Sequence, residues 1–152
     1  MKARVATAAD ATEVVRLAAI LFESMDVDAS GADWQEAGRR HVEERIGMDM
    51  TAFVVDDPGS PGRLVASAAG TIAQRLPTPF SPTGTAGYVQ WVCTEPDFRG
   101  QGLARLVMSS LLDWYDRRGI PTVELHATSM AESLYMELGF SDSGPRALRR
   151  RT

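Results

Sequence analysis

The sequence predicts an α/β protein with a mixed, mostly antiparallel central sheet flanked by helices. Two hydrophobic periodicities alternate along its 152 residues. Residues 88–94 are rich in β-branched and aromatic side chains, which is typical of a buried strand. Residues 103–118 carry apolar side chains three and four positions apart, which is typical of an amphipathic helix. The turn-forming residues 57–62 separate two strand-like runs, which indicates an antiparallel hairpin.

The N-terminal half predicts a short edge strand, two helices and this hairpin. Thr7 and Asp10 have the spacing of a capping box at the start of the first helix. Ser67, Gly70 and the alanines around them leave little side-chain volume on the second hairpin strand, so a helix or a ligand can approach it closely. These elements cover residues 3–6, about 9–22, about 32–46, 51–55 and 64–75.

The C-terminal half predicts the central strand, the long helix, a strand over residues 123–127 and a short helix after Ser129. Residues 76–85 contain three prolines and a glycine, which indicates a surface loop. We expect the chain to return as a hairpin after Phe140, although residues 141–145 have the composition of a loop.

The composition is that of an ordinary globular protein, with 44% hydrophobic and 24% charged residues, and we expect residues 1–152 to form a single domain. No apolar run approaches the roughly 20 residues that span a bilayer, and the N-terminus lacks a signal-like segment, so no membrane partner is expected. Cys93 is the only cysteine, which precludes an internal disulfide and suits a cytoplasmic location. The net charge of −4 argues against nucleic-acid binding and slightly favours a cationic substrate.

A glycine-rich turn, Arg-Gly-Gln-Gly-Leu-Ala over residues 99–104, lies between the central strand and the long helix. A turn that opens a helix presents unpaired backbone N–H groups at the positive end of the helix dipole, so it attracts phosphate. Arg105 stands where a dinucleotide fingerprint needs its third glycine, and the chain contains no Gly-Lys-Ser/Thr triplet of a P-loop. Both of those phosphate motifs are therefore excluded.

The pattern Arg-x-x-Gly-x-Ala in this turn resembles the acyl-CoA pyrophosphate loop of the GNAT-type N-acetyltransferases. A second motif follows in the family's order: a strand, a short helix and then Leu134-Tyr135-x-x-x-Gly139-Phe140. The resemblance covers residues 85–140 and implies a GNAT-like fold that uses acetyl-CoA as acetyl donor. It also implies that the cofactor is bound by Arg99, Gly100, Gln101, Gly102, Leu103 and Ala104.

The resemblance further implies three roles near the thioester. Backbone N–H groups around Val92, Cys93 and Thr94 hold the donor and polarise its carbonyl, at a bulge in the strand and a splay from the next strand. Tyr135 is the general acid for the departing thiolate, since a phenol with a pKa of about 10 stays protonated at neutral pH. Thr128 stands where relatives often carry an asparagine that contacts the pantetheine arm; it either replaces that contact or caps the following helix.

No general base is identified. Residues 88–93 contain no carboxylate or imidazole, and Glu95 follows them beside the phosphate loop, where it either acts as a base or faces solvent. His126 more often has a structural role in such a position, and we expect His41 to be solvated. Cys93 is expected to be a small buried hydrophobic residue rather than a nucleophile. An amine that is nearly neutral, or that loses its proton to water, needs no dedicated base.

The leading hypothesis is an enzyme that transfers an acetyl group directly from acetyl-CoA to a primary amine, without a metal. The alternative is a non-catalytic acyl-CoA-binding or sensing domain of the same fold. A domain for another phosphorylated ligand would require both motifs to be coincidental. By resemblance, residues 22–34 and 76–86 shape the acceptor pocket, but they carry no code for the amine, so small-molecule and peptide acceptors both stay open. A homodimer is compatible with the resemblance.

Overall fold

The computed structural model describes residues 1–142 and 144–152, and it contains a five-stranded sheet with the strand order β1-β2-β3-β4-β5. Neighbouring strands are antiparallel except β4 and β5, which are parallel. The predicted mixed, mostly antiparallel sheet is therefore confirmed. The strands are β1 (Arg4–Val5), β2 (Met50–Asp56), β3 (Leu64–Gln74), β4 (Thr85–Thr94) and β5 (Val123–Glu124).

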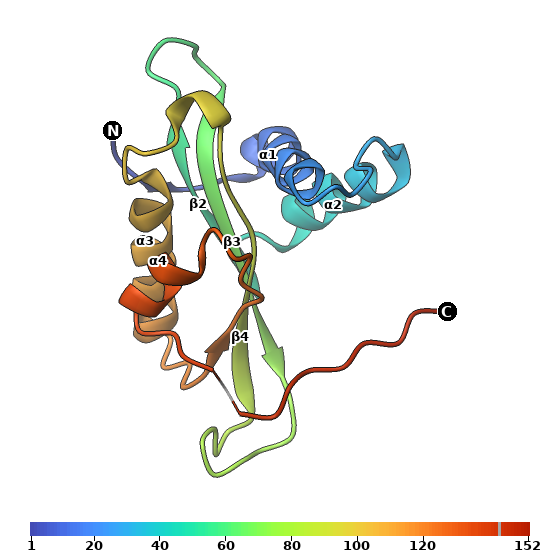
Figure 1. Ribbon diagram of the computed structural model, residues 1–152, viewed down its shortest axis with the longest axis vertical. Coiled ribbons are helices and arrows are strands. Elements are labelled where there is room, and N and C mark those ends of the chain that lie inside the picture. Colours follow the sequence, from blue (N-terminus) through green and yellow to red (C-terminus); the bar gives the residue numbers. More distant parts are fainter. Residues whose placement is uncertain (143) are drawn as a thin grey trace.

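Helices cover both faces of the sheet, with α1 and α2 on one face and α3 and α4 on the other (Figure 1). The capping box predicted for the first helix is present, because the backbone N–H of Thr7 donates to the Asp10 carboxylate over 2.8 Å. Within the described residues, no helix has both the length and the hydropathy needed to cross a membrane. The helices are α1 (Ala11–Ser24), α2 (Ala32–Arg45), α3 (Leu103–Arg117) and α4 (Glu132–Glu137), with short 3-10 helices η1 (Ala8–Asp10) and η2 (Pro96–Phe98).

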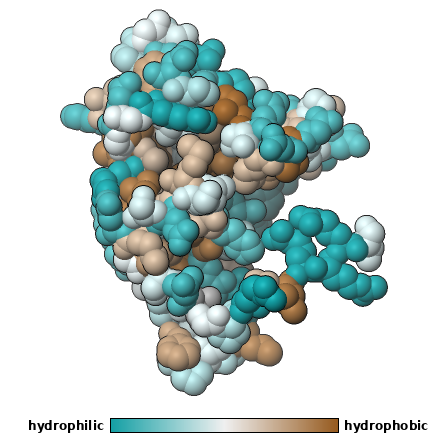
Figure 2. Space-filling model, viewed as in Figure 1, coloured by the Kyte–Doolittle hydropathy of each residue, from teal (hydrophilic) through white to brown (hydrophobic). Residues whose placement is uncertain are grey.

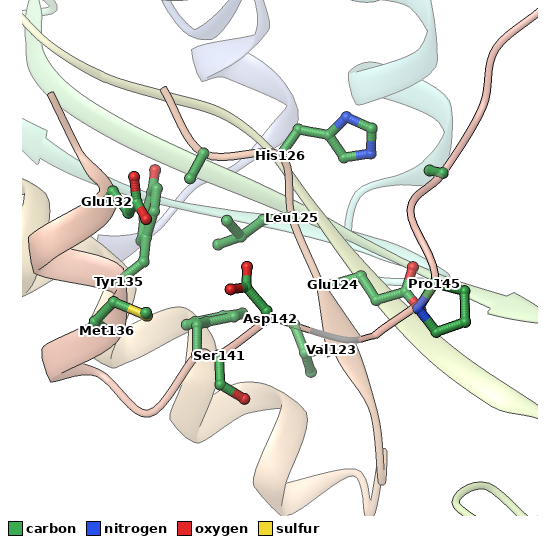
Figure 3. Close-up of a pocket in the computed structure, with 13 residues that line it drawn as sticks. Val123, Glu124, Leu125, His126, Glu132, Tyr135, Met136, Ser141, Asp142 and Pro145 are labelled. Carbon is green, nitrogen blue, oxygen red and sulfur yellow. The ribbon is translucent and has the colours of Figure 1, made fainter. Parts of the chain in front are cut away.

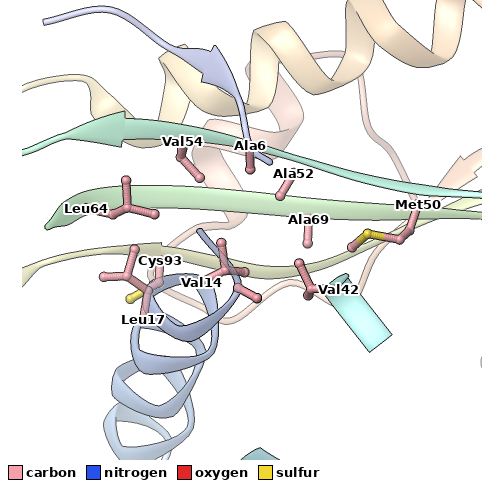
Figure 4. Close-up of a cluster of buried hydrophobic side chains, with 11 residues drawn as sticks. Ala6, Val14, Leu17, Val42, Met50, Ala52, Val54, Leu64, Ala69 and Cys93 are labelled. Carbon is pink, nitrogen blue, oxygen red and sulfur yellow. The ribbon is translucent and has the colours of Figure 1, made fainter. Parts of the chain in front are cut away.

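Two clusters of buried apolar side chains fill the space between the layers. Val14 and Leu17 of α1 belong to the first cluster, which lies between the sheet and the α1–α2 pair (Figure 4). Val107 and Leu111 of α3 belong to the second, on the opposite face. The alanines of β3 contribute to both clusters, so their small side chains let helices pack closely on both faces, as the sequence predicted.

The C-terminal region differs from the sequence prediction. β5 ends at Glu124 instead of residue 127, and within the described residues no strand follows α4. The tail instead leads away from the rest of the molecule (Figure 1). The predicted final hairpin is therefore wrong, because Pro145 has no N–H for a ladder and the polar residues around it offer no apolar face to bury. Residue 143 of the predicted loop lies outside the described residues.

Candidate active site

β4 contains a bulge at Trp91, where the backbone is left-handed with a φ of 56°. Between the pairs Ala69–Gln90 and Ser67–Cys93, β3 advances by two residues while β4 advances by three, so β4 carries one extra residue. Such a conformation is disfavoured for a residue with a side chain and persists only where its surroundings impose it. The extra residue lets Gln90 and Trp91 face the same side of the sheet, where strict alternation would separate them.

β4 and β5 separate immediately after they meet, since they pair only at Gly87–Val123 and Tyr88–Glu124. Beyond these pairs, the β5 side of β4 has no partner strand in the described part of the chain, so alternate N–H groups there face open space. A cleft of about 470 Å³ occupies this gap. It is lined by Leu21, Phe22, Met25, residues 88–94, Ala104, Leu125, His126, Thr128, Ala131, Leu134, Tyr135, Arg149 and Arg151.

The surface of the molecule is hollowed on the face shown in Figure 2. Apolar residues are exposed in the middle of this face and are surrounded by hydrophilic ones, while the C-terminal tail is mainly hydrophilic. An apolar hollow with a polar rim is typical of a ligand site.

The glycine-rich loop connects the end of β4 to the N-terminus of α3. Gly100 and Gly102 have φ values of 77° and 78°, a conformation that residues with side chains rarely adopt. Within the described residues, the backbone N–H groups of residues 100–105 donate no hydrogen bond. The loop borders a hollow of about 300 Å³ that is lined by Thr94, Phe98, Arg99, Gly100, Gly102, Leu103, Ala104, Arg105 and Leu134.

The hollow and the cleft are neighbours, since both are lined by Thr94, Ala104 and Leu134. A diphosphate in the hollow would meet unpaired N–H groups at the positive end of α3. An arm attached to that diphosphate could continue along the open side of β4. The buried Oγ1 of Thr94 has no hydrogen-bond partner among the described residues, so a polar group is free to bind the arm. The residues present therefore fit an elongated donor such as acetyl-CoA.

Tyr135 of α4 lies in the wall of the cleft and is only 7% exposed. Its ring packs edge-to-face on Phe140, with ring centroids 5.9 Å apart. Burial raises the pKa of the Tyr135 phenol, so the group stays protonated at neutral pH. Tyr135 also borders a groove of about 590 Å³ beside β5, where it lies next to Glu132 while His126 points away from it (Figure 3).

The structure brings nearly all of the predicted donor-binding residues to these two spaces. Residues 92–94, Ala104 and Thr128 line the cleft, and the loop residues line the hollow. Gln101 is the exception, because it is exposed and lines neither space. Thr128 does not cap the following helix: the N-cap of α4 is Ala131, which makes no side-chain cap hydrogen bond. The capping alternative for Thr128 is therefore wrong.

Glu95 does not face solvent as one alternative predicted. It is 8% exposed, and its carboxylate forms ion pairs with Arg16 of α1 and with Arg63, the latter at 2.8 Å. Two guanidinium groups thus hold the carboxylate at the end of β4 and tie it to α1. A buried carboxylate stays charged only when it is paired with cations in this way. Glu95 therefore has a structural role and does not project freely into the cleft.

Cys93 is buried in the cluster under α1, as the sequence predicted. Desolvation by burial raises the pKa of its thiol to about 11. At neutral pH only about one molecule in 10⁴ would carry a thiolate, which leaves Cys93 a poor nucleophile.

The two histidines lie at the margins of the site. His126 is exposed and stacks edge-to-face on Tyr88, with centroids 5.7 Å apart. His41 is exposed on α2, which agrees with the prediction that it is solvated. Among the described residues that line the cleft, none is a carboxylate. The structure thus adds no obvious general base to those considered from the sequence.

Sequence reasoning missed an aromatic wall beside the cleft. Trp34 of α2 meets Phe22 of α1 and Trp91 of β4 edge-to-face, with centroids 5.4 Å and 6.3 Å apart. Phe22 and Trp34 do belong to the predicted acceptor segment 22–34. Residues 76–86, however, line neither the cleft nor the hollow and lie at the opposite end of the β3–β4 hairpin (Figure 1), so their role in the acceptor pocket stays a prediction. The bulge that places Trp91 has no local signature, because its left-handed residue is not a glycine.

The fold and the site together define an acyltransferase class in which a glycine-rich loop at a helix N-terminus receives the donor. The chain belongs to the acetyltransferase (GNAT) family, whose model matches residues 17–140. It is accordingly an acetyl-CoA-dependent N-acetyltransferase. Among curated proteins, none matches the chain significantly.

Solved structures share the fold over nearly the whole chain. A predicted acetyltransferase with acetyl-CoA from Clostridium acetobutylicum has a TM-score of 0.86 and 21% identity, covering 98% of this chain and 95% of that one. A GCN5-related N-acetyltransferase from Ralstonia eutropha has a TM-score of 0.84 and 24% identity, covering 98% and 97%. Glucosamine-6-phosphate N-acetyltransferase from Arabidopsis thaliana has a TM-score of 0.74 and 21% identity, covering 99% of each chain. At these identities the likeness establishes the fold.

Proposed function

We propose that the cleft transfers an acetyl group directly from acetyl-CoA to a primary amine of a small molecule or peptide, within a single domain. The observation that carries this proposal is the bulge at Trp91 beside the splayed end of β4. Because β5 has splayed away, the alternate N–H groups of Val92 and Thr94 face the cleft, which Tyr135 lines and which adjoins the phosphate hollow. Donor binding, carbonyl polarisation and acid catalysis are thus supported in one place.

The donor is bound through the backbone. N–H groups of the loop and the first turn of α3 receive the diphosphate, and Arg99 adds positive charge at the rim. Backbone N–H groups at Val92 and Thr94 stabilise the carbonyl oxygen as negative charge develops on it. Thr94 and Thr128 line the path of the arm, and the Thr94 hydroxyl has no hydrogen-bond partner among the described residues.

Tyr135 supplies the proton that the leaving group requires. The amine nitrogen forms a bond to the carbonyl carbon, the carbon–sulfur bond breaks, and the Tyr135 hydroxyl protonates the sulfur. The nitrogen passes its own proton to water, and the Tyr135 phenolate regains a proton from water. Among the described residues no carboxylate lines the cleft, and its imidazole, His126, is exposed at the margin. The acceptor therefore reacts from its neutral form, and the rate should follow the neutral fraction of the amine.

The test is release of free CoA thiol from acetyl-CoA with a panel of small amines and peptide N-termini. Initial rates measured at varied concentrations of both substrates should give intersecting reciprocal plots, as expected for a ternary complex. Parallel plots, together with an acetylated protein in the absence of amine, would contradict direct transfer. Tight acetyl-CoA binding without thiol release for any amine would favour a sensing role.

A further inference from the structure

We infer that the acceptor amine carries an aromatic ring system, and that this ring binds in a separate apolar cavity between α2 and the sheet. The inference rests on the proposed acetyl transfer. The cavity has a volume of about 470 Å³ and lies against the part of β4 that carries the bulge. Its apolar walls include Phe22, Trp34, Val42, Met50 and Trp91.

The cavity adjoins the reaction cleft. Phe22, Gln90 and Trp91 line both spaces, so the two spaces are neighbours. A ring in the cavity can therefore be linked by a short chain to an amine that lies near the open N–H groups of residues 92–94. The bulge produces this arrangement, because its extra residue lets Gln90 and Trp91 share one side of β4.

The chemistry of the lining favours a flat apolar group. The indoles of Trp34 and Trp91 cross at 70°, and the ring of Phe22 meets Trp34 at 84°. Aromatic guests prefer such edge-to-face and offset contacts. Among the described residues that line the cavity, only His41 is ionisable, so a phosphorylated or strongly charged group would be buried there without a guanidinium or ammonium partner.

The size of the cavity also suits a ring. A dry cavity of about 150 Å³ suffices for benzene, so this cavity accommodates a one- or two-ring group together with its linker. Gly38 of α2 lets the Trp91 wall of the cavity pack closely on the helix. A Cβ added at Gly38 would lie 3.0 Å from Cη2 of Trp91 and 3.3 Å from Cγ2 of Val15, so the absent side chain lets the indole lie close against α2.

The inference is tested by comparing 2-phenylethylamine with 2-methoxyethylamine as acceptors; they differ only in the phenyl or methoxy substituent on the ethylamine chain. Glucosamine 6-phosphate serves as a negatively charged competing acceptor. Burial of the phenyl ring should raise kcat/KM roughly 10- to 100-fold for 2-phenylethylamine over 2-methoxyethylamine. Equal kcat/KM values for these two amines, or a preference for glucosamine 6-phosphate, would overturn the inference.

A matched pair of variants locates the ring. Ala37 is an exposed residue of α2 that lines the cavity, so Ala37→Phe places a ring at its mouth without removing an existing contact. The kcat/KM ratio of the two amines should fall about tenfold or more, mainly because the phenyl-bearing amine acquires a higher KM. Ala32→Phe makes the same change at an exposed α2 position outside the cavity and should keep the wild-type ratio. An unchanged ratio in Ala37→Phe would contradict the location.

A binding measurement separates failure of this inference from failure of acetyl transfer. Two of the three tryptophans, Trp34 and Trp91, line the cavity, so 2-phenylethylamine should change the intrinsic fluorescence saturably in the presence of CoA. The apparent Kd should rise about tenfold in Ala37→Phe and stay the same in Ala32→Phe. If no amine releases thiol, this titration still decides the question, and a wild type without a saturable signal would refute the aromatic site.

Discussion

The hydroxyl of Tyr115 on α3 lies 2.9 Å from the carbonyl oxygen of Thr71 on β3, and 3.2 Å from that of Tyr88 on β4. Two glycines make room for the ring, since an added Cβ would lie 2.5 Å from Cε1 of Tyr115 at Gly87 and 2.3 Å from its hydroxyl oxygen at Gly70. Burial raises the pKa of Tyr115, so the hydroxyl keeps its proton for these carbonyls. One contact thus positions α3, whose N-terminus carries the phosphate loop, against both strands.

Tyr115→Phe should therefore destabilise the fold by about 1–2 kcal/mol, because it leaves buried carbonyl oxygens with one donor fewer. Gly87→Ala should cost more, since its methyl group would overlap the tyrosine ring. Urea unfolding measures both changes. Gly59→Ala is the control, because a Cβ there would meet only the Asp57 carboxylate at 3.6 Å. Unfolding free energies that match wild type for Tyr115→Phe would show that the contact contributes nothing.

Gly102→Ala should weaken acetyl-CoA binding about tenfold or more, because the added methyl group occupies space beside the N–H groups that receive the diphosphate. A Cβ at Gly102 would meet no atom of the described chain within 4 Å, so the loss would come from the ligand. Isothermal titration measures the affinity.

Gly119→Ala is the matched control for Gly102→Ala. Gly119 lies just beyond the other end of α3, has a φ of 67° and is equally open, so the two variants carry similar backbone strain. Both should lose about 1 kcal/mol of stability, yet only Gly102→Ala should lose affinity. Equal acetyl-CoA affinities in the two variants would contradict the proposal that this loop binds the diphosphate.

Tyr135→Phe should lower kcat roughly 10- to 10³-fold, because it removes the proton for the departing thiolate. Acetyl-CoA affinity and folding should change little, since the ring keeps its contact with Phe140. Acyl donors with more acidic thiols should suffer a smaller loss. A variant that retains full kcat under conditions where chemistry limits the rate would contradict the acid role.

The pH profile of the wild type offers an independent check on Tyr135. The phenol acts in its protonated form, which is present below its pKa, and burial raises that pKa above the ordinary value. The activity should therefore rise with the neutral fraction of the amine and show no loss of the acid at pH values where an ordinary phenol is still protonated. A decline in kcat between pH 7 and 9 at saturating substrates would argue for a different acid.

Cys93→Ala should keep kcat within about threefold of wild type, because the buried thiol with its pKa of about 11 takes no covalent part. The smaller side chain leaves a small void in the cluster under α1, so stability should fall by about 1 kcal/mol. Thiol-release assays and urea unfolding measure the two effects. Loss of turnover in a folded variant would instead support a mechanism in which Cys93 is acetylated before the amine reacts.

Local chemistry allowed the sequence by itself to determine much of the molecule. Some features depend only on residues that are close in sequence, so they can be predicted without knowledge of the fold. These features are the strand and helix periods, the capping box of Thr7 and Asp10, and the glycine-rich loop before α3. Tyr135 was singled out differently: its predicted role comes from the family resemblance of the short motif that contains it.

Only the tertiary structure decided the features that depend on distant partners. Glu95 is buried because Arg16, 79 residues earlier, reaches it from α1. β5 pairs with β4 at only two residue pairs and ends at Glu124, which no pattern within residues 123–127 reveals. Trp91 adopts its left-handed bulge only where β3 and α2 pack around it, and this packing joins the aromatic cavity to the cleft. Side-chain periodicity reports which residues a strand can bury, whereas contacts between elements decide where that strand bends and what its bent segment faces.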